Sequence, residues 1–149
     1  MKKTDARRSR PPRRGAAMVE MALVMPVFFL VVLGIIEFGR AMMVSNLVTS
    51  AAREGARMAV VDGSTNTDVT NAINTFLHQS TGVSTSNIST TITVVAAAGN
   101  SDPSNQVANA HMRDLITVKV QVPFNSVALL KGKYLAGKQL VGQSAMRHE

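Results

Sequence analysis

The sequence predicts an α+β protein in which a long N-terminal transmembrane helix continues into a small exported domain with an antiparallel sheet of about three strands. A basic segment precedes an apolar stretch of membrane-spanning length, and the helical pattern continues beyond that stretch. Three short segments of the C-terminal half alternate apolar and polar residues, as strands do. We therefore expect a basic leader (1–15), a transmembrane helix (16–36), its exported continuation (37–61) and a small α+β domain (62–149).

The basic charge of the chain is concentrated in the leader. Of the formal net charge of +7, residues 1–15 contribute +6 through seven basic residues and one acidic residue. A basic segment directly before an apolar span is typical of a cytoplasmic N-terminus, with the residues after the span exported. Binding of the leader to nucleic acid is the alternative interpretation, but the position of the charge favours the topological role. The leader contains almost no apolar residues, so we expect it to be disordered.

The apolar stretch has the length of a bilayer. Residues 16–36 would form a helix about 31 Å long at ~1.5 Å per residue, close to the thickness of a hydrocarbon core. Residues 21–36 contain no charged side chain, whereas the core helix of a soluble protein would have a polar face. No small-residue cleavage site follows the stretch, which argues against a secretory signal peptide removed on the far side of the membrane.

Two residues in this helix are unusual for a membrane span. A carboxylate such as Glu20 costs ~2.5–3.5 kcal/mol at mid-bilayer and less near its edge. Two interpretations are open: Glu20 lies at headgroup depth, or it meets a positive partner such as a processing enzyme or the amino terminus of a neighbouring subunit. Pro26 removes one backbone N–H and frees the carbonyl of Ala22, so we expect a bend there.

The helical pattern continues over residues 38–60. Residues at roughly helical spacing predict its apolar face: Phe38, Met42, Leu47 or Val48, Ala51, Gly55 and Met58. Small residues at Ala51, Gly55 and Ala59 would let another backbone approach closely, either from the same domain or from another subunit. Turn-forming residues at 62–66 end the helix.

Two pairs of opposite charge stand three residues apart on this helix. Glu37 with Arg40, and Glu54 with Arg57, could each form an ion pair worth a few tenths of a kcal/mol.

The remaining chain predicts one short helix and three strands. Residues 67–79 have an amphipathic pattern, with Thr67 or Asp68 as the N-cap. Strands are predicted at 88–94 and 116–122, separated by a long polar loop, and a third strand at 140–146. A short helical turn is expected around 126–130. Because no crossover helix separates the strands, an antiparallel sheet packed on the long helix is the simplest arrangement.

Several residues together resemble a known family. Gly15 at the end of a basic leader, then Ala16, with Glu20 as the fifth residue after the glycine, resembles the processing site of type IV prepilins. The longer pattern, with Pro26, Glu37-Phe38-Gly39-Arg40 and the segment 52–57, is similar to TadE-like pseudopilins of tight-adherence (Flp) pilus systems. Ala16 departs from that pattern, because the family has a large apolar residue after the cut.

The resemblance implies a type IV pilin-like fold and the role of a minor structural subunit required for pilus assembly. A prepilin peptidase would cut after Gly15, and the helix would contact other pilins, the inner-membrane Tad secretion machinery and the lipid bilayer. Residues implied in packing are Glu20, Pro26, Glu37, Arg40, Ala51, Gly55 and Ala59. The protein would lie in the inner membrane with its C-terminal domain exported, and would enter a surface pilus. The alternative is an uncleaved, signal-anchored envelope scaffold.

The sequence offers no pattern of catalytic chemistry. His78, His111 and His148 are scattered, cysteine is absent, and the carboxylates do not have metal-ligand spacing. The chain also has neither a phosphate-binding glycine loop nor a Gly-x-Ser-x-Gly motif, and its few aromatic residues argue against nucleic-acid stacking. We therefore expect no enzyme, no metal or cofactor, no nucleic acid and no small-molecule substrate.

Overall fold

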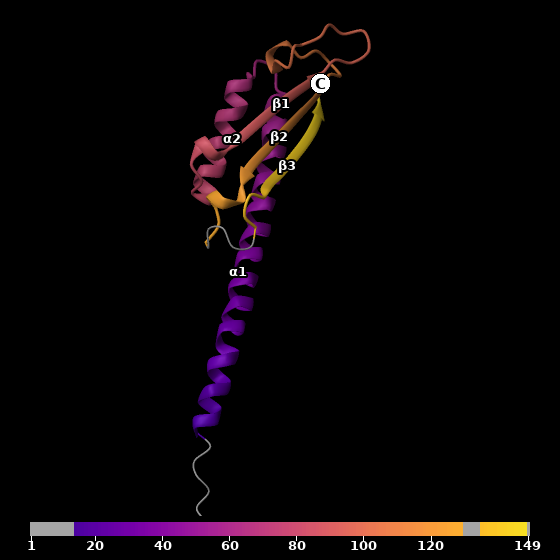
Figure 1. The fold of residues 1–149 in the computed structure, drawn as a ribbon. Helices are drawn as coiled ribbons and strands as arrows, with labels where there is room; N and C mark the ends of the chain where they lie inside the picture. Colours follow the sequence, from indigo (N-terminus) through magenta and orange to yellow (C-terminus); the bar gives the residue numbers. More distant parts are fainter. Residues whose placement is uncertain (1–13, 130–134, 149) are drawn as a thin grey trace, which may run out of the picture. The chain divides into compact units, whose positions relative to one another are not determined.

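The computed structural model describes residues 14–129 and 135–148 (Figure 1). Two helices, α1 (Arg14–Ala59) and α2 (Asn66–Thr81), precede three strands, β1 (Ser89–Val95), β2 (Leu115–Pro123) and β3 (Gln139–Arg147). Single turns of 3-10 helix lie at Thr85–Asn87, Val107–Asn109 and Phe124–Ser126. A long N-terminal apolar helix followed by a small antiparallel sheet confirms the predicted α+β class. Residues 1–13 of the expected leader lie outside the described residues.

Helix α1 is 46 residues long and continues through Pro26. The chain divides into two compact units after Ile35, so α1 contributes to both. The apolar half of α1 is long and apolar enough to cross a membrane, and none of its most apolar window is buried. Among the described residues, one helix is therefore suited to a single-pass membrane anchor. The expected bend at Pro26 stays a prediction.

The sheet is antiparallel, with β2 in the middle of the order β1-β2-β3. Val118 of β2 is paired with Ile92 on one side and Ser144 on the other. Alternate residues of β2 are fully buried (Ile116, Val118, Val120 and Val122), which is the two-residue period expected for a strand with one face on the core. The three predicted strands are confirmed. The strand β1 is shifted by one residue towards the C-terminus, and β2 and β3 extend one residue further at each end.

The second half of α1 is part of the core of the domain. Its buried apolar residues are all small or medium-sized: Ala41, Val44, Val48, Ala51, Ala52, Ala56 and Ala59. The expected apolar face was wrong at its start, because Phe38 and Met42 are 54% and 69% exposed. The buried face begins instead at Glu37 and Ala41. Small side chains point inward because the sheet comes close to the helix, while the large ones point outward.

Gly142 of β3 marks the closest approach of the sheet to α1. A Cβ atom there would lie 2.6 Å from the carbonyl oxygen of Val48 and 2.7 Å from the Cα of Thr49. On α1 itself, Gly55 faces Ile73 of α2 and Val118 of β2. A side chain at Gly142 would meet backbone atoms, whereas one at Gly55 would meet the far end of the Ile73 side chain.

Helix α2 begins one residue before the expected start, and its N-cap is Thr65 rather than Thr67 or Asp68. The hydroxyl oxygen of Thr65 accepts a hydrogen bond from the Asp68 N–H at 3.3 Å, and the Asp68 carboxylate accepts one from the Thr65 N–H at 3.2 Å. Asp68 is thus the partner of the cap in a reciprocal capping box. The helix ends at Gly82, whose φ of 72° is readily adopted only by glycine.

The turn after β2 also differs from the sequence prediction. The expected helical turn at 126–130 is a 3-10 turn at Phe124–Ser126 instead, and residue 130 lies outside the described residues. The buried Phe124 ring fixes the turn at the end of the strand.

Candidate processing site and domain anchor

The residues of the predicted processing site all lie on the exposed N-terminal part of α1. Gly15, Ala16 and Glu20 are exposed, and Ala16 and Glu20 share a helix face because they are four residues apart. A Cβ atom added to Gly15 would meet no atom within 4 Å. The backbone there is helical without a positive φ. Neither space nor backbone conformation therefore requires glycine at this position.

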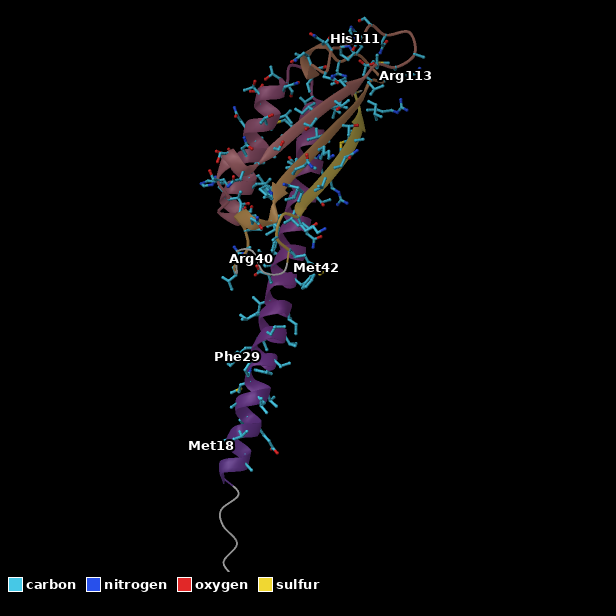
Figure 2. All side chains as sticks on the ribbon, viewed as in Figure 1. Met18, Phe29, Arg40, Met42, His111 and Arg113 are labelled. Atoms are coloured by element: carbon cyan, nitrogen blue, oxygen red, sulfur yellow. The ribbon has the colours of Figure 1, made fainter. Side chains whose placement is uncertain are left out.

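Glu37 and Arg40 join α1 to the chain segment that follows β2. Glu37 is 1% exposed, and its Oε2 accepts a hydrogen bond from the Leu129 N–H at 3.3 Å. The Arg40 Nε donates to the carbonyl of Val127. Figure 2 shows Arg40 and Met42 at one end of the domain and His111 and Arg113 at the other. We call Glu37, Arg40 and residues 127–129 the domain anchor.

Short local hydrogen bonds hold residues 127–129 in place. The N–H groups of Val127 and Ala128 both donate to the carbonyl of Phe124 at 2.9 Å, and the Phe124 N–H donates to the Lys138 carbonyl at 2.8 Å. Because Phe124 and Val127 are buried, the segment is fixed to the core. Glu37 and Arg40 therefore bind a segment that its own hydrogen bonds hold to the core.

The small residues at Ala51, Gly55 and Ala59 are buried in the core of their own domain. Of the two interpretations open from the sequence, contact within the same domain is the one present here. The expected pair of Glu54 and Arg57 is also present, with an Arg57 Nη1 to Glu54 Oε2 distance of 3.6 Å. Both side chains are about two-thirds exposed, so the pair contributes little to stability.

Comparison with known protein families relates this geometry to a family. Residues 15–57 match the family model of TadE-like proteins. The predicted resemblance is thereby confirmed over these residues. Comparisons with curated proteins and with solved structures gave no match. TadE-like proteins are structural and pilus-associated, so the match supports a pseudopilin-type protein of a Tad pilus.

The TadE-like segment has a clear relation to the fold. It starts at Gly15, contains the apolar half of α1 and both charged residues of the domain anchor, and ends two residues before α1 does. The sheet, α2 and residues 127–129 lie beyond it. The TadE-like segment is therefore the helix itself, and the remainder of the domain covers one face of its second half.

The structure contains a buried carboxylate that sequence reasoning did not identify. Asp114 is fully buried and accepts hydrogen bonds from the Ala97 N–H (2.8 Å), the His111 N–H (2.8 Å) and the Asn100 side-chain amide (2.7 Å). These bonds, led by that from Ala97, lower the pKa of Asp114 from 3.8 to about 2. Asp114 organises the loop between β1 and β2. Its place directly before a strand gave no sign of burial in the sequence.

The three histidines occupy separate places in the chain. His78 Nδ1 lies 2.8 Å from the Val83 carbonyl oxygen, His111 Nδ1 is 4.0 Å from Asp114 Oδ2, and His148 Nε2 is 3.5 Å from Asp62 Oδ1. Across residues 14–129 and 135–148, no group of three or more metal-ligating side chains is close enough to hold an ion. Each of the three histidines contacts a residue in a loop or turn.

Proposed function

We propose that this protein is a minor pseudopilin, a structural subunit required for assembly of a Tad (Flp) adhesive pilus. A prepilin peptidase cuts it between Gly15 and Ala16, and it performs no enzymatic reaction of its own. The observation that carries the proposal is the family match, which begins at Gly15 and runs through the apolar helix.

The properties of Gly15 support recognition by another molecule. Glycine destabilises a helix by ~1 kcal/mol relative to alanine. Neither positive φ nor close packing explains it at this position, unlike Gly82 or Gly142. A protease groove that holds the backbone closely would explain it, because any side chain would obstruct that approach.

Charge and topology give the orientation that we propose. The +6 leader stays in the cytoplasm, the apolar half of α1 spans the inner membrane, and the sheet domain is exported. The partners are the prepilin peptidase, other pilins or pseudopilins, and the inner-membrane Tad secretion machinery. After cutting, Ala16 becomes the N-terminus of a subunit that can leave the membrane for the pilus.

The test is mass spectrometry of the N-terminus of protein purified from native membranes. We expect the mature chain to begin at Ala16, and Gly15→Val to retain the leader. Gly39→Val is the matched control, because a Cβ atom added to Gly39, which also lies in α1, would likewise meet no atom within 4 Å. The control should be cut as the wild type is. An intact leader on the wild-type chain in cells with an active peptidase would favour the uncleaved envelope scaffold instead.

A further inference from the structure

Large apolar side chains are exposed at the end of the domain that contains the domain anchor. Phe38 is 54% exposed, Met42 69%, Met43 53% and Leu129 60%. Three of these come from α1, and Leu129 comes from the segment that Glu37 holds. Phe38 and Met42 are one turn apart on α1, and a contiguous apolar patch, unlike a single exposed residue, marks a contact surface.

The distance of this surface from the membrane follows from the continuity of the helix. Glu37 comes directly after Ile36, the last residue of the expected span, and Arg40 is about 6 Å further along at ~1.5 Å per residue. The headgroup layer adds about 5–7 Å to each side of the hydrocarbon core. Residues held by Glu37 and Arg40 therefore lie within or directly above the headgroups.

The exposed face of α1 changes character at the same depth. Beyond Met43 the exposed positions of α1 are polar or charged: Asn46, Ser50, Arg53, Glu54 and Arg57. Apolar exposure thus ends about 10 Å beyond Ile36, at ~1.5 Å per residue. Contact of this face with lipid would end where the exposed positions become polar.

We infer that Phe38, Met42, Met43 and Leu129 form a surface that seats the exported domain on the phospholipid headgroups. Exposed basic residues, Arg40 and Lys138, flank it and suit lipid phosphates. The Glu37 carboxylate presents no charge to the lipid, because it is buried against the Leu129 N–H. The surface fixes the height of the domain above the membrane. The inference rests on the membrane anchor and holds whether or not the leader is cut.

The chain has no cysteine, so single cysteines can carry an environment-sensitive fluorophore. The full-length protein would be placed in vesicles of phosphatidylcholine and phosphatidylglycerol, some containing lipids with a quencher at headgroup depth and others with a quencher deep in the acyl chains. Leu129→Cys reports on the proposed surface. Met112→Cys is the matched control, because Met112 is 67% exposed but lies in the loop between β1 and β2. Val27→Cys reports on the span itself.

We expect the shallow quencher to reduce the Leu129 probe's emission severalfold more than that of the Met112 probe, and the deep quencher to act on the Val27 probe. Equal quenching of the Leu129 and Met112 probes, with the Val27 probe still quenched, would overturn the inference but leave the membrane anchor in place. An unquenched Val27 probe would contradict both the membrane anchor and the inference. Protection of the Leu129 probe that depends on protein concentration rather than on lipid would assign the surface to a second copy of the chain, and would also overturn the inference.

Discussion

The two halves of helix α1 differ in the size of their apolar side chains and in what surrounds them. The first half carries large apolar residues that are exposed, such as Met18 (75%) and Leu23 (72%). The second half buries small residues, and Ala51, Ala52, Ala56 and Ala59 are at most 1% exposed. Small apolar residues thus face the sheet in the second half, whereas large ones are exposed in the first half and, like Phe38 and Met42, on the outward side of the second.

The difference has a physical basis in the distance between packed elements. A sheet can lie directly on a helix only where neither contributes bulk, and the contact of Gly142 with the backbone of Val48 and Thr49 is of this kind. Lipid chains impose no such limit, so the first half of α1 can carry large residues on every face. Substitutions should therefore affect stability strongly in one half and weakly in the other.

The largest loss of stability is expected for Gly142→Ala. The new methyl group would lie 2.6 Å from a backbone carbonyl of α1, so β3 or the helix must move, at a cost of about 1–3 kcal/mol in the free energy of unfolding. Gly55→Ala should cost less, because its nearest neighbour is the end of the Ile73 side chain. Gly39→Ala is the control on open helix surface. The measurement is thermal unfolding of the full chain in detergent.

If Gly39→Ala destabilised the protein as much as Gly142→Ala does, the proposed importance of small residues between the sheet and α1 would be wrong. Equal effects would mean that the close approach of the sheet to the helix contributes nothing specific. A stabilising Gly39→Ala agrees with the argument, because alanine favours helix by ~1 kcal/mol over glycine.

The sequence predicted the order of elements well because their patterns are local. Ile116, Val118, Val120 and Val122 alternate without interruption, and the strand they predicted is present. The buried face of α1 was wrong near Phe38 because the pattern search favoured large apolar residues. Which side of a helix meets a sheet depends on residues far along the chain, such as Gly142, and no local pattern contains that information.

A smaller effect on stability is expected from acid at the other end of the domain. The folded-state pKa of Asp114 is about 2, below the ordinary value of 3.8, so its contribution to stability is complete above pH ~3.8 and is lost as the pH falls towards 2. Asp114→Asn should reduce this loss between those pH values. The measurement is the unfolding midpoint against pH, with Asp102→Asn as the control because Asp102 is exposed in the same loop.

The acid titration also tests whether the two halves of α1 unfold separately. Acid that unfolds the sheet domain should leave the helical circular-dichroism signal of the apolar half in detergent micelles, because residues 21–36 contain no side chain that titrates. Complete loss of helix at the same pH would mean that the two halves unfold together. A midpoint whose pH dependence is the same with and without Asp114→Asn would remove Asp114 as the cause.

The sequence could predict only those residues of the candidate site that lie within one short pattern. Gly15, Ala16 and Glu20 lie within six residues, so the sequence could predict them as a processing site. The contact of Glu37 with Leu129 joins residues 92 positions apart. The sequence suggested only a possible pair of Glu37 with Arg40, because nothing nearby indicated that the Glu37 carboxylate would be buried.

Glu20→Gln should have the smallest effect on stability, and a selective effect on assembly. Cutting after Gly15 would create an amino group at Ala16, partly protonated near neutral pH. That cation and the Glu20 carboxylate of an adjacent subunit would each be costly alone in an apolar bundle, and together they offset part of that cost. We propose that the pair sets the register between subunits. Glutamine keeps the size of the side chain but loses its charge.

The expected result is normal cutting and an unchanged unfolding midpoint for Glu20→Gln, with less protein in pili sheared from the surface than in membranes. Glu54→Gln is the matched control, because Glu54 is also an exposed glutamate of α1 but pairs with Arg57 in the domain half. It should assemble normally, since that pair contributes little. Normal piliation with Glu20→Gln would place Glu20 at headgroup depth, where its carboxylate only reaches water. The two halves of α1 would then differ in packing alone, and not in how they recognise other subunits.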